Sequence, residues 1–113
     1  ELAIIEAARG WLKLIDDGDY SKSWDQAAGF FKSAVTSEQW TASVKTVRVP
    51  LGKLILREVR SKKYTTQMPG VPDGEYMVIE FDASLENKKE AVETVTSMKD
   101  KDGIWRVSGY YIK

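Results

Sequence analysis

The sequence predicts an α+β domain, in which three N-terminal helices pack on one face of a curved four-stranded antiparallel sheet. Apolar residues recur every three or four positions in the first part of the chain, and at every second position from residue 53 onward. Pro50 and Gly52 mark the change of period, and no linker or low-complexity tract interrupts either part. We therefore expect residues 1–113 to form a single domain, because this length can bury a substantial core.

An apolar stripe predicts the first helix, and residues typical of helix ends separate it from a second one. The stripe covers residues 4–15 at helical spacing, with charged residues on the other side. Gly18 follows it, at the position where a left-handed residue commonly ends a helix. Asp19 or Ser21 can cap a second helix, which Gly29 bends or ends.

A third, shorter helix is predicted from Thr36 onward. Thr36 and Gln39 have the spacing of a capping box, in which each side chain bonds the other residue's backbone amide. The apolar stripe of this helix consists of Trp40, Val44 and Val47, and we expect all three to face the core.

The second half of the chain reads as an antiparallel meander. The four strands are predicted at residues 53–67, 77–85, 91–100 and 104–112. The first is expected to be bulged because its alternation slips, and Asp102-Gly103 is a strong hairpin turn before the last. The second alternates most cleanly, so Glu80 and Asp82 should point away from the helices. For Glu93 in the third strand, the direction is less certain.

Composition excludes several kinds of function. The seventeen basic and seventeen acidic residues balance, so no net charge attracts the protein to nucleic acid or to a membrane surface. No apolar run is long enough for this domain to insert into a membrane. Histidine and cysteine are both absent, which removes the usual zinc ligands and the histidine-dependent nucleophile systems. We expect no metal and no cofactor.

Several stretches resemble the bacterial family called domain of unknown function 4019. They are Gly18–Trp24, Arg48–Gly52 with Arg57, Met68–Tyr76, Glu93–Thr96 and Asp102–Ile112. The resemblance covers nearly the whole chain in the expected order, and Met68 replaces a more frequent leucine without consequence. It implies an exported protein with no assigned activity, and no catalytic residues to transfer. It also implies a fold similar to the cystatin-like cone of ketosteroid isomerase and nuclear transport factor 2.

Export is expected from this resemblance alone, in the periplasm or outside the cell. The chain starts at Glu1 rather than at methionine, so we expect a preceding segment that includes any signal peptide. The absence of cysteine is compatible with either side of a membrane.

Two classes of function remain for such a fold. We favour a non-enzymatic domain that binds a small ligand or a protein, with dimerisation through the sheet face opposite the helices as a further option. Val78 and an outward tyrosine would support that interface, while Glu80 and Asp82 would limit it. The alternative is a cofactor-free isomerase, dehydratase or hydrolase with a tyrosine and a carboxylate in the cone pocket. An isolated carboxylate in an apolar cavity would favour the enzyme, and a filled core the binding domain.

Arg57 is the most informative candidate residue. If Ile55 and Val59 face inward, strict alternation carries Arg57 inward with them. A buried guanidinium either pairs with a carboxylate, for which Glu58 and Glu93 are candidates, or holds an anionic ligand. We favour the structural pair, although a bulge that turns Arg57 to solvent is also compatible with the sequence.

Three aromatic residues complete the candidate ligand-binding set. Trp24 lies on a helical apolar stripe, so core packing is the favoured reading of it. Tyr110 and Tyr111 must point to opposite faces of the sheet, and we take Tyr111 as the ligand candidate. Tyr76 follows the loop at residues 69–75, which we interpret as a stiff structural corner with a type II turn at Gly70, and less favourably as a pocket rim.

Overall fold

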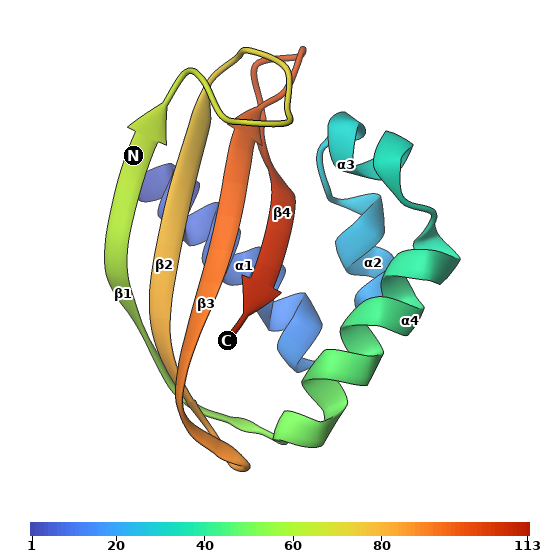
Figure 1. Cartoon of the computed structure of the whole chain (residues 1–113), viewed down its shortest axis with the longest axis vertical. Coiled ribbons are helices and arrows are strands. Elements are labelled where there is room, and N and C mark those ends of the chain that lie inside the picture. Colours follow the sequence, from blue (N-terminus) through green and yellow to red (C-terminus); the bar gives the residue numbers. More distant parts are fainter.

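The computed structural model describes all 113 residues and has an α+β architecture, as the sequence predicts (Figure 1). The helices are α1 (Leu2–Asp16), α2 (Tyr20–Asp25), α3 (Gly29–Ala34) and α4 (Ser37–Arg48), followed by a 3₁₀ turn at Val49–Leu51. The strands are β1 (Leu54–Thr65), β2 (Tyr76–Leu85), β3 (Lys88–Lys99) and β4 (Trp105–Ile112). No helix has both the length and the apolar character needed to cross a membrane.

The four strands form one antiparallel sheet in sequence order, β1-β2-β3-β4. β1 is bulged as predicted, with register shifts near Ile55 and Arg60. β3 begins earlier than predicted, because Glu86 and Asn87 alone turn the chain from β2 into β3. The predicted inward set of β2 is confirmed, since the residues at alternate positions 77–85 are all buried. The opposite side chains, including Glu80 and Asp82, point away from α1.

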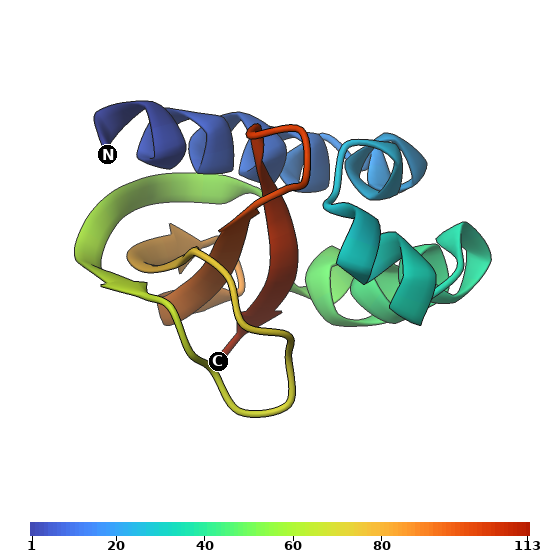
Figure 2. The same cartoon turned by 90° about the horizontal axis from the view of Figure 1, so that it is seen from above.

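α1 covers one face of the sheet and forms the main core with it (Figure 2). Ile5, Ala8, Leu12 and Ile15 repeat at helical spacing and are buried against β2 and β3, where Phe81 is fully enclosed. No helix lies over the opposite face (Figure 2). That uncovered face is called the outer face below.

The second predicted helix is two short helices, because Gly29 does not bend one helix but begins another. Asp100, in the turn before β4, accepts a hydrogen bond from the Gly29 amide at 3.1 Å. The amide of Ala28 donates to the carbonyl of Val107 at 2.8 Å. These two bonds attach the α2–α3 connection to the β4 end of the sheet.

α4 starts with the predicted capping box, in which Thr36 and Gln39 bond each other's backbone amides. Trp40 and Val44 are buried, as predicted for the stripe of this helix. Val47 is not buried: its side chain is 50% exposed.

Ser23 joins the helices around three tryptophans. Its carbonyl accepts from the indole N–H of Trp11, and its hydroxyl accepts from that of Trp40, both at 2.9 Å. Trp24 donates its indole N–H to the carbonyl of Val35 at 2.8 Å. Each buried indole therefore keeps a polar partner while its ring adds apolar contact.

Candidate functional site

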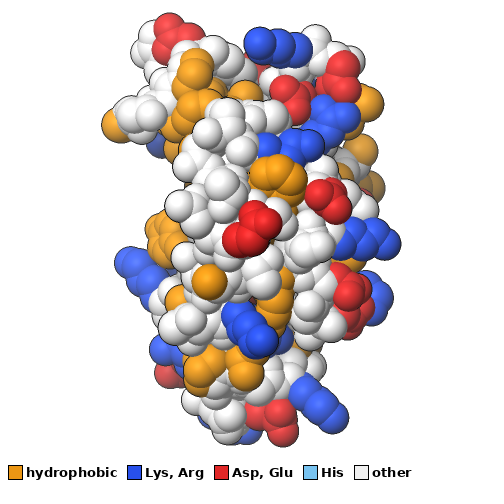
Figure 3. Space-filling model, turned by 90° about the vertical axis from the view of Figure 1, so that its right-hand side faces the viewer, with side chains coloured by type: hydrophobic (Ala, Val, Ile, Leu, Met, Phe, Trp, Pro, Cys, Tyr) orange, Lys and Arg blue, Asp and Glu red, His pale blue; other side chains and the backbone are white.

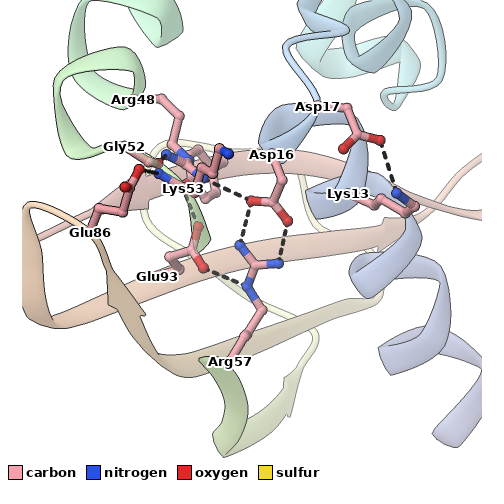
Figure 4. A network of polar contacts seen from close by, with 10 residues as sticks. Lys13, Asp16, Asp17, Arg48, Gly52, Lys53, Arg57, Glu86 and Glu93 are labelled. Carbon is pink, nitrogen blue, oxygen red and sulfur yellow. Dashed lines mark hydrogen bonds and ion pairs between the residues drawn. The ribbon is translucent and has the colours of Figure 1, made fainter. Parts of the chain in front are cut away.

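Five polar side chains from helices and strands meet in one cluster, and Figure 4 labels four of them, Asp16, Arg48, Arg57 and Glu93. The five are Asp16 at the end of α1, Arg48 at the end of α4, Arg57 on β1, Glu93 on β3 and Tyr110 on β4. We call this group the buried charge cluster. The side chain of Glu93 is completely buried, and those of Arg48 and Arg57 are 5% and 8% exposed.

Arg57 is the centre of this cluster. Its two terminal nitrogens donate to both carboxylate oxygens of Asp16 at 2.8 and 2.9 Å, and its Nε donates to Glu93 Oε1 at 2.7 Å. Burial alone would lower the pKa of Arg57, but the hydrogen bonds and charges of Asp16 and Glu93 outweigh it and raise the pKa above its ordinary value. Arg57 therefore stays charged at any pH at which the protein is folded.

The register of the sheet explains why two ionised groups face inward. Arg57 pairs with Ala83 of β2, and Glu93 pairs with Phe81 on the other side of β2. Ala83 and Phe81 both face α1, so Arg57 and Glu93 must share that face. A buried ion pair is tolerated only where each charge finds its partner, and here both partners lie on the same face.

Tyr110 is the hydrogen-bond partner of the second carboxylate oxygen of Glu93. Its hydroxyl donates to Glu93 Oε2 at 2.6 Å, a short charge-assisted bond. Burial, the Glu93 charge and this hydrogen bond together raise the pKa of Tyr110 well above its ordinary value. Tyr110 is thus a permanent donor, and each oxygen of Glu93 has a partner.

Arg48 ties α4 to the same cluster. It donates to the carbonyl of Gly52 and, at 3.3 Å, to Asp16 Oδ1. Its Nε is buried without a hydrogen-bond partner. Glu86 Oε1 accepts from the backbone amide of Lys53 at 2.7 Å and so fixes the loop that carries Gly52.

A pocket of about 270 Å³, open to solvent, borders the cluster. Asp16 and Arg48 of the cluster line it, together with Lys53 and Glu86. Within the cluster the charges of two arginines and two carboxylates cancel. The arrangement can therefore lock α1, α4, β1 and β3 together, but its only buried carboxylate is not free to take a proton from a substrate.

A larger hollow lies on the outer face of the sheet, with a volume of about 540 Å³. Its walls carry three acidic and three basic side chains, namely Glu58, Asp82, Glu90, Arg60, Lys89 and Lys113. A second hollow of about 210 Å³ adjoins it, and shares Arg60, Val92 and Lys113 with it while adding Tyr111. Both hollows are open to solvent, and most of the residues that line them are polar or charged.

The four predicted ligand-binding residues are not brought together. Arg57 is buried in the charge cluster and pairs with Glu93, one of the two partners that the sequence suggested. Tyr76 is buried and donates to the carbonyl of Pro72 within the loop, and Trp24 is half-buried among the helices. Tyr111 alone is on the outer face, 54% exposed, at the edge of the smaller hollow.

Sequence reasoning missed Asp16 and Arg48 as members of the cluster, although a signal for both was present. Leu12 and Asp16 are four residues apart on α1, and Val44 and Arg48 are four apart on α4. Helical spacing therefore places each charge on the buried stripe, one turn after a buried apolar residue. Because Asp16 and Arg48 carry opposite charges and each continues a buried stripe, the sequence indicates that both have charged partners inside the protein.

Comparison with known proteins identifies the family of this chain. A family model described as "Protein of unknown function (DUF4019)" matches residues 7–110. The chain belongs to the DUF4019 family. No curated protein has a matching sequence. The DUF4019 description names no reaction. The chain has no group of three acidic residues placed to hold a metal ion.

Proposed function

We propose that this DUF4019 protein is a non-enzymatic binding domain that takes a small polar molecule on the outer face of its sheet. The observation that carries the proposal is the state of Glu93. This carboxylate has Arg57 on one oxygen and Tyr110 on the other, and no part of it is exposed. A general base needs a free oxygen within reach of the substrate, which Glu93 does not offer.

The outer face supports the second half of the proposal. Its larger hollow, about 540 Å³, is within the range of small-molecule sites. Its walls carry charged groups of both signs, so a ligand with both hydrogen-bond donors and acceptors can find partners there. Tyr111 adds an exposed aromatic ring at one end, where an apolar part of the ligand can rest.

A thermal-shift screen against a library of small polar metabolites is the first test. A ligand that binds only the folded state raises the apparent melting temperature, by an amount that grows with its concentration. Each hit is then titrated into ¹⁵N-labelled protein. We expect amide shifts at Ser84, Val92 and Tyr111, which belong to or border the two hollows.

Two outcomes would overturn the proposal. One is a set of hits whose shifts fall around Asp16 and Lys53 instead, at the pocket of the charge cluster. The other is a stable dimer by light scattering in which the outer face is protected from hydrogen exchange, because a second copy would then occupy the site. Arg60→Gln tests the site directly and should weaken hits, whereas Lys22→Gln on α2 should not.

A second candidate rests on the Tyr110–Glu93 pair, which has the residue types of a cofactor-free isomerase, dehydratase or hydrolase. Tyr110 also lines a small cleft beside α4, so a substrate there could reach its ring. Any turnover found with small ketones or esters should disappear in Tyr110→Phe if the pair is catalytic. Unchanged turnover in that variant would leave the pair with a structural role alone.

A further inference from the structure

β4 has a free backbone edge beside α4. It is a terminal strand of the sheet, and at its end Lys113 exchanges two hydrogen bonds with Val92 of β3, at 3.0 and 3.1 Å. In an antiparallel pair, alternate residues bond the neighbour and the residues between them turn their backbone groups away. Ile112 and Tyr110 are the residues in between. No backbone hydrogen bond from another element reaches either of them.

This edge forms one wall of an apolar cleft of about 190 Å³. Trp40, Val44 and Val47 of α4 form the opposite wall, and Tyr111 stands at the mouth. Trp40 and Val44 are buried by the core behind them, whereas Val47 is 50% exposed. The apolar stripe of α4 thus continues from the core to Val47, whose side chain no other part of the chain covers. Figure 3 faces this side of the molecule and shows its hydrophobic side chains as separate patches among charged ones.

We propose that this cleft binds an extended peptide segment, which adds to β4 as a fifth strand. Tyr110 and Ile112 each offer an N–H donor and a C=O acceptor, spaced two residues apart as an incoming strand requires. Alternate side chains of that strand point into the cleft, where Val44 and Val47 provide apolar contact. Main-chain bonds supply most of the affinity, and the cleft selects apolar side chains.

The charges near the cleft indicate which side chains the bound peptide should carry. The cleft contains no ionised residue, but Lys113 follows Ile112 directly and forms no ion pair. Its backbone is fixed by Val92, so the charge stays at the end of the edge. The preferred segment therefore alternates β-branched apolar residues with small polar ones, and has an acidic side chain that reaches Lys113.

The other edge of the sheet does not offer the same site. β1 has two bulges and carries Lys62 and Lys63, which are features that discourage strand addition. β4 has no lysine before its end, and its only register shift leaves Ser108 unpaired between Val107 and Gly109, before Tyr110 and Ile112. The two edges make an internal comparison for the experiment.

The test uses the acetylated and amidated hexapeptide Thr-Val-Ser-Val-Glu-Thr, titrated into the full chain. The two valines of the peptide share one face of the strand, while its glutamate lies on the other face, as Lys113 does. In free protein, the amides of Tyr110 and Ile112 should exchange with solvent rapidly. With about nine-tenths of the protein bound they should exchange about tenfold more slowly, because only the free fraction then exchanges. Amides of Arg57 and Lys62 on β1 should keep their rates.

Two matched controls separate the contributions. The same peptide with N-methylated amides at alternate positions keeps its side chains but cannot complete the ladder, and should not bind. Val47→Ser should weaken peptide binding about fivefold, equivalent to roughly 1 kcal/mol of apolar contact. Val49→Ser changes an equally exposed valine outside the cleft and should leave affinity unchanged.

Three results would overturn the proposal. Slow exchange of Tyr110 and Ile112 in dilute free protein would mean that the edge is already covered. Protection that rises with protein concentration alone would identify a second copy of the chain as the occupant. Equal binding of the N-methylated peptide would show that side chains, not strand addition, hold it. Tyr111 and Lys113 also line the hollows of the outer face, but none of these results measures small-molecule binding there, so the proposed function is tested separately.

Discussion

Arg57 neutralises two carboxylates at once, and its loss should be costly. In Arg57→Ala, Glu93 would remain fully buried without its cationic partner, and Asp16 would lose both bonds of the bidentate pair. We expect the free energy of unfolding to fall by about 3–5 kcal/mol, the usual cost of removing one partner of a buried ion pair. Urea denaturation followed by tryptophan fluorescence measures this loss.

The double variant Arg57→Met, Glu93→Leu is the control for that experiment. It removes the buried charge together with its partner, so much of the lost stability should return. If Arg57→Ala alone costs less than 1 kcal/mol, Glu93 must gain water or a proton on losing Arg57. The cluster would then be looser than its geometry indicates.

At the scale of the element, the turn between α4 and β1 depends on Gly52. Its φ of 78° and ψ of −160° belong to a region that only glycine adopts easily. A Cβ there would lie 2.8 Å from Glu86 Cβ and from Glu86 Oε1. We expect Gly52→Ala to lower the free energy of unfolding by about 3 kcal/mol, from backbone strain and displacement of Glu86 together.

Gly70 is the matched control, since its φ is 80° but no atom lies within 4 Å of the added carbon. Gly70→Ala should cost about 1 kcal/mol, the price of a left-handed alanine alone. Thermal or urea unfolding of the two variants under identical conditions gives the comparison. Equal losses would mean that Glu86 moves aside freely and does not fix the turn.

The hairpin between β3 and β4 should respond to acid. Arg106 donates to both oxygens of Asp102 at 2.9 and 2.8 Å, which lowers the Asp102 pKa from its ordinary 3.8 to about 2. A lowered pKa stabilises the folded state above the unfolded value, and that stability is lost as pH falls through the folded value. The window is therefore between about pH 4 and pH 2.

We expect Asp102→Asn to be less stable than the wild type at pH 6, and the difference to shrink below about pH 4 and to vanish as the pH falls through about 2. Asparagine keeps the turn preference, so the variant removes the charge and little else. Urea midpoints of both proteins at several pH values measure the difference. A constant difference across this range would show that the ion pair with Arg106 contributes nothing in solution.

Periodicity predicts some elements better than others, and β2 and β3 show why. In β2 the inward positions 77–85 are all apolar, so one face is unmistakable. In β3 the inward residues include Glu93 and Ser97, whereas the outward ones include Val92 and Met98. Two faces of equal polarity do not identify the buried one, because polar groups can be buried when they find partners elsewhere in the fold.

The same limit applies to the candidate site. The alternation of side chains within β1 could place Arg57 inside, and the charge of Glu93 within β3 suggests it as a partner. Each of these inferences needs the sequence of one strand only. The bidentate pair with Asp16 requires knowing that the end of α1 meets β1, which is a tertiary fact. The division of the second helix at Gly29 is also tertiary, since Asp100 of a distant turn fixes the start of α3.

At the scale of the whole molecule, helices α2 to α4 stand beside the sheet rather than on it (Figures 1 and 2). They are attached at two ends. At one end Ala28 and Gly29 bond the β4 region, and at the other Arg48 reaches Asp16 in the charge cluster. Between these points, Trp11 and Trp40 lie with ring centroids 6.0 Å apart. Such an arrangement favours opening of the helices while the sheet stays folded.

Arg48→Met should expose this behaviour in native-state hydrogen exchange. The variant keeps the volume of the side chain but removes its bonds to Asp16 and Gly52, so the end of α4 is released. We expect α4 amides, such as that of Val44, to lose protection by about tenfold, equivalent to about 1.4 kcal/mol. Amides in the middle of β2 and β3 should keep their protection.

Arg60→Met is the control, because it removes an exposed ion pair with Asp82 on the sheet and should change the protection of neither group of amides. Equal loss of protection in α4 and in the central strands would show that the molecule opens as one unit, and that Arg48 stabilises the whole fold instead of attaching one part of it to the other.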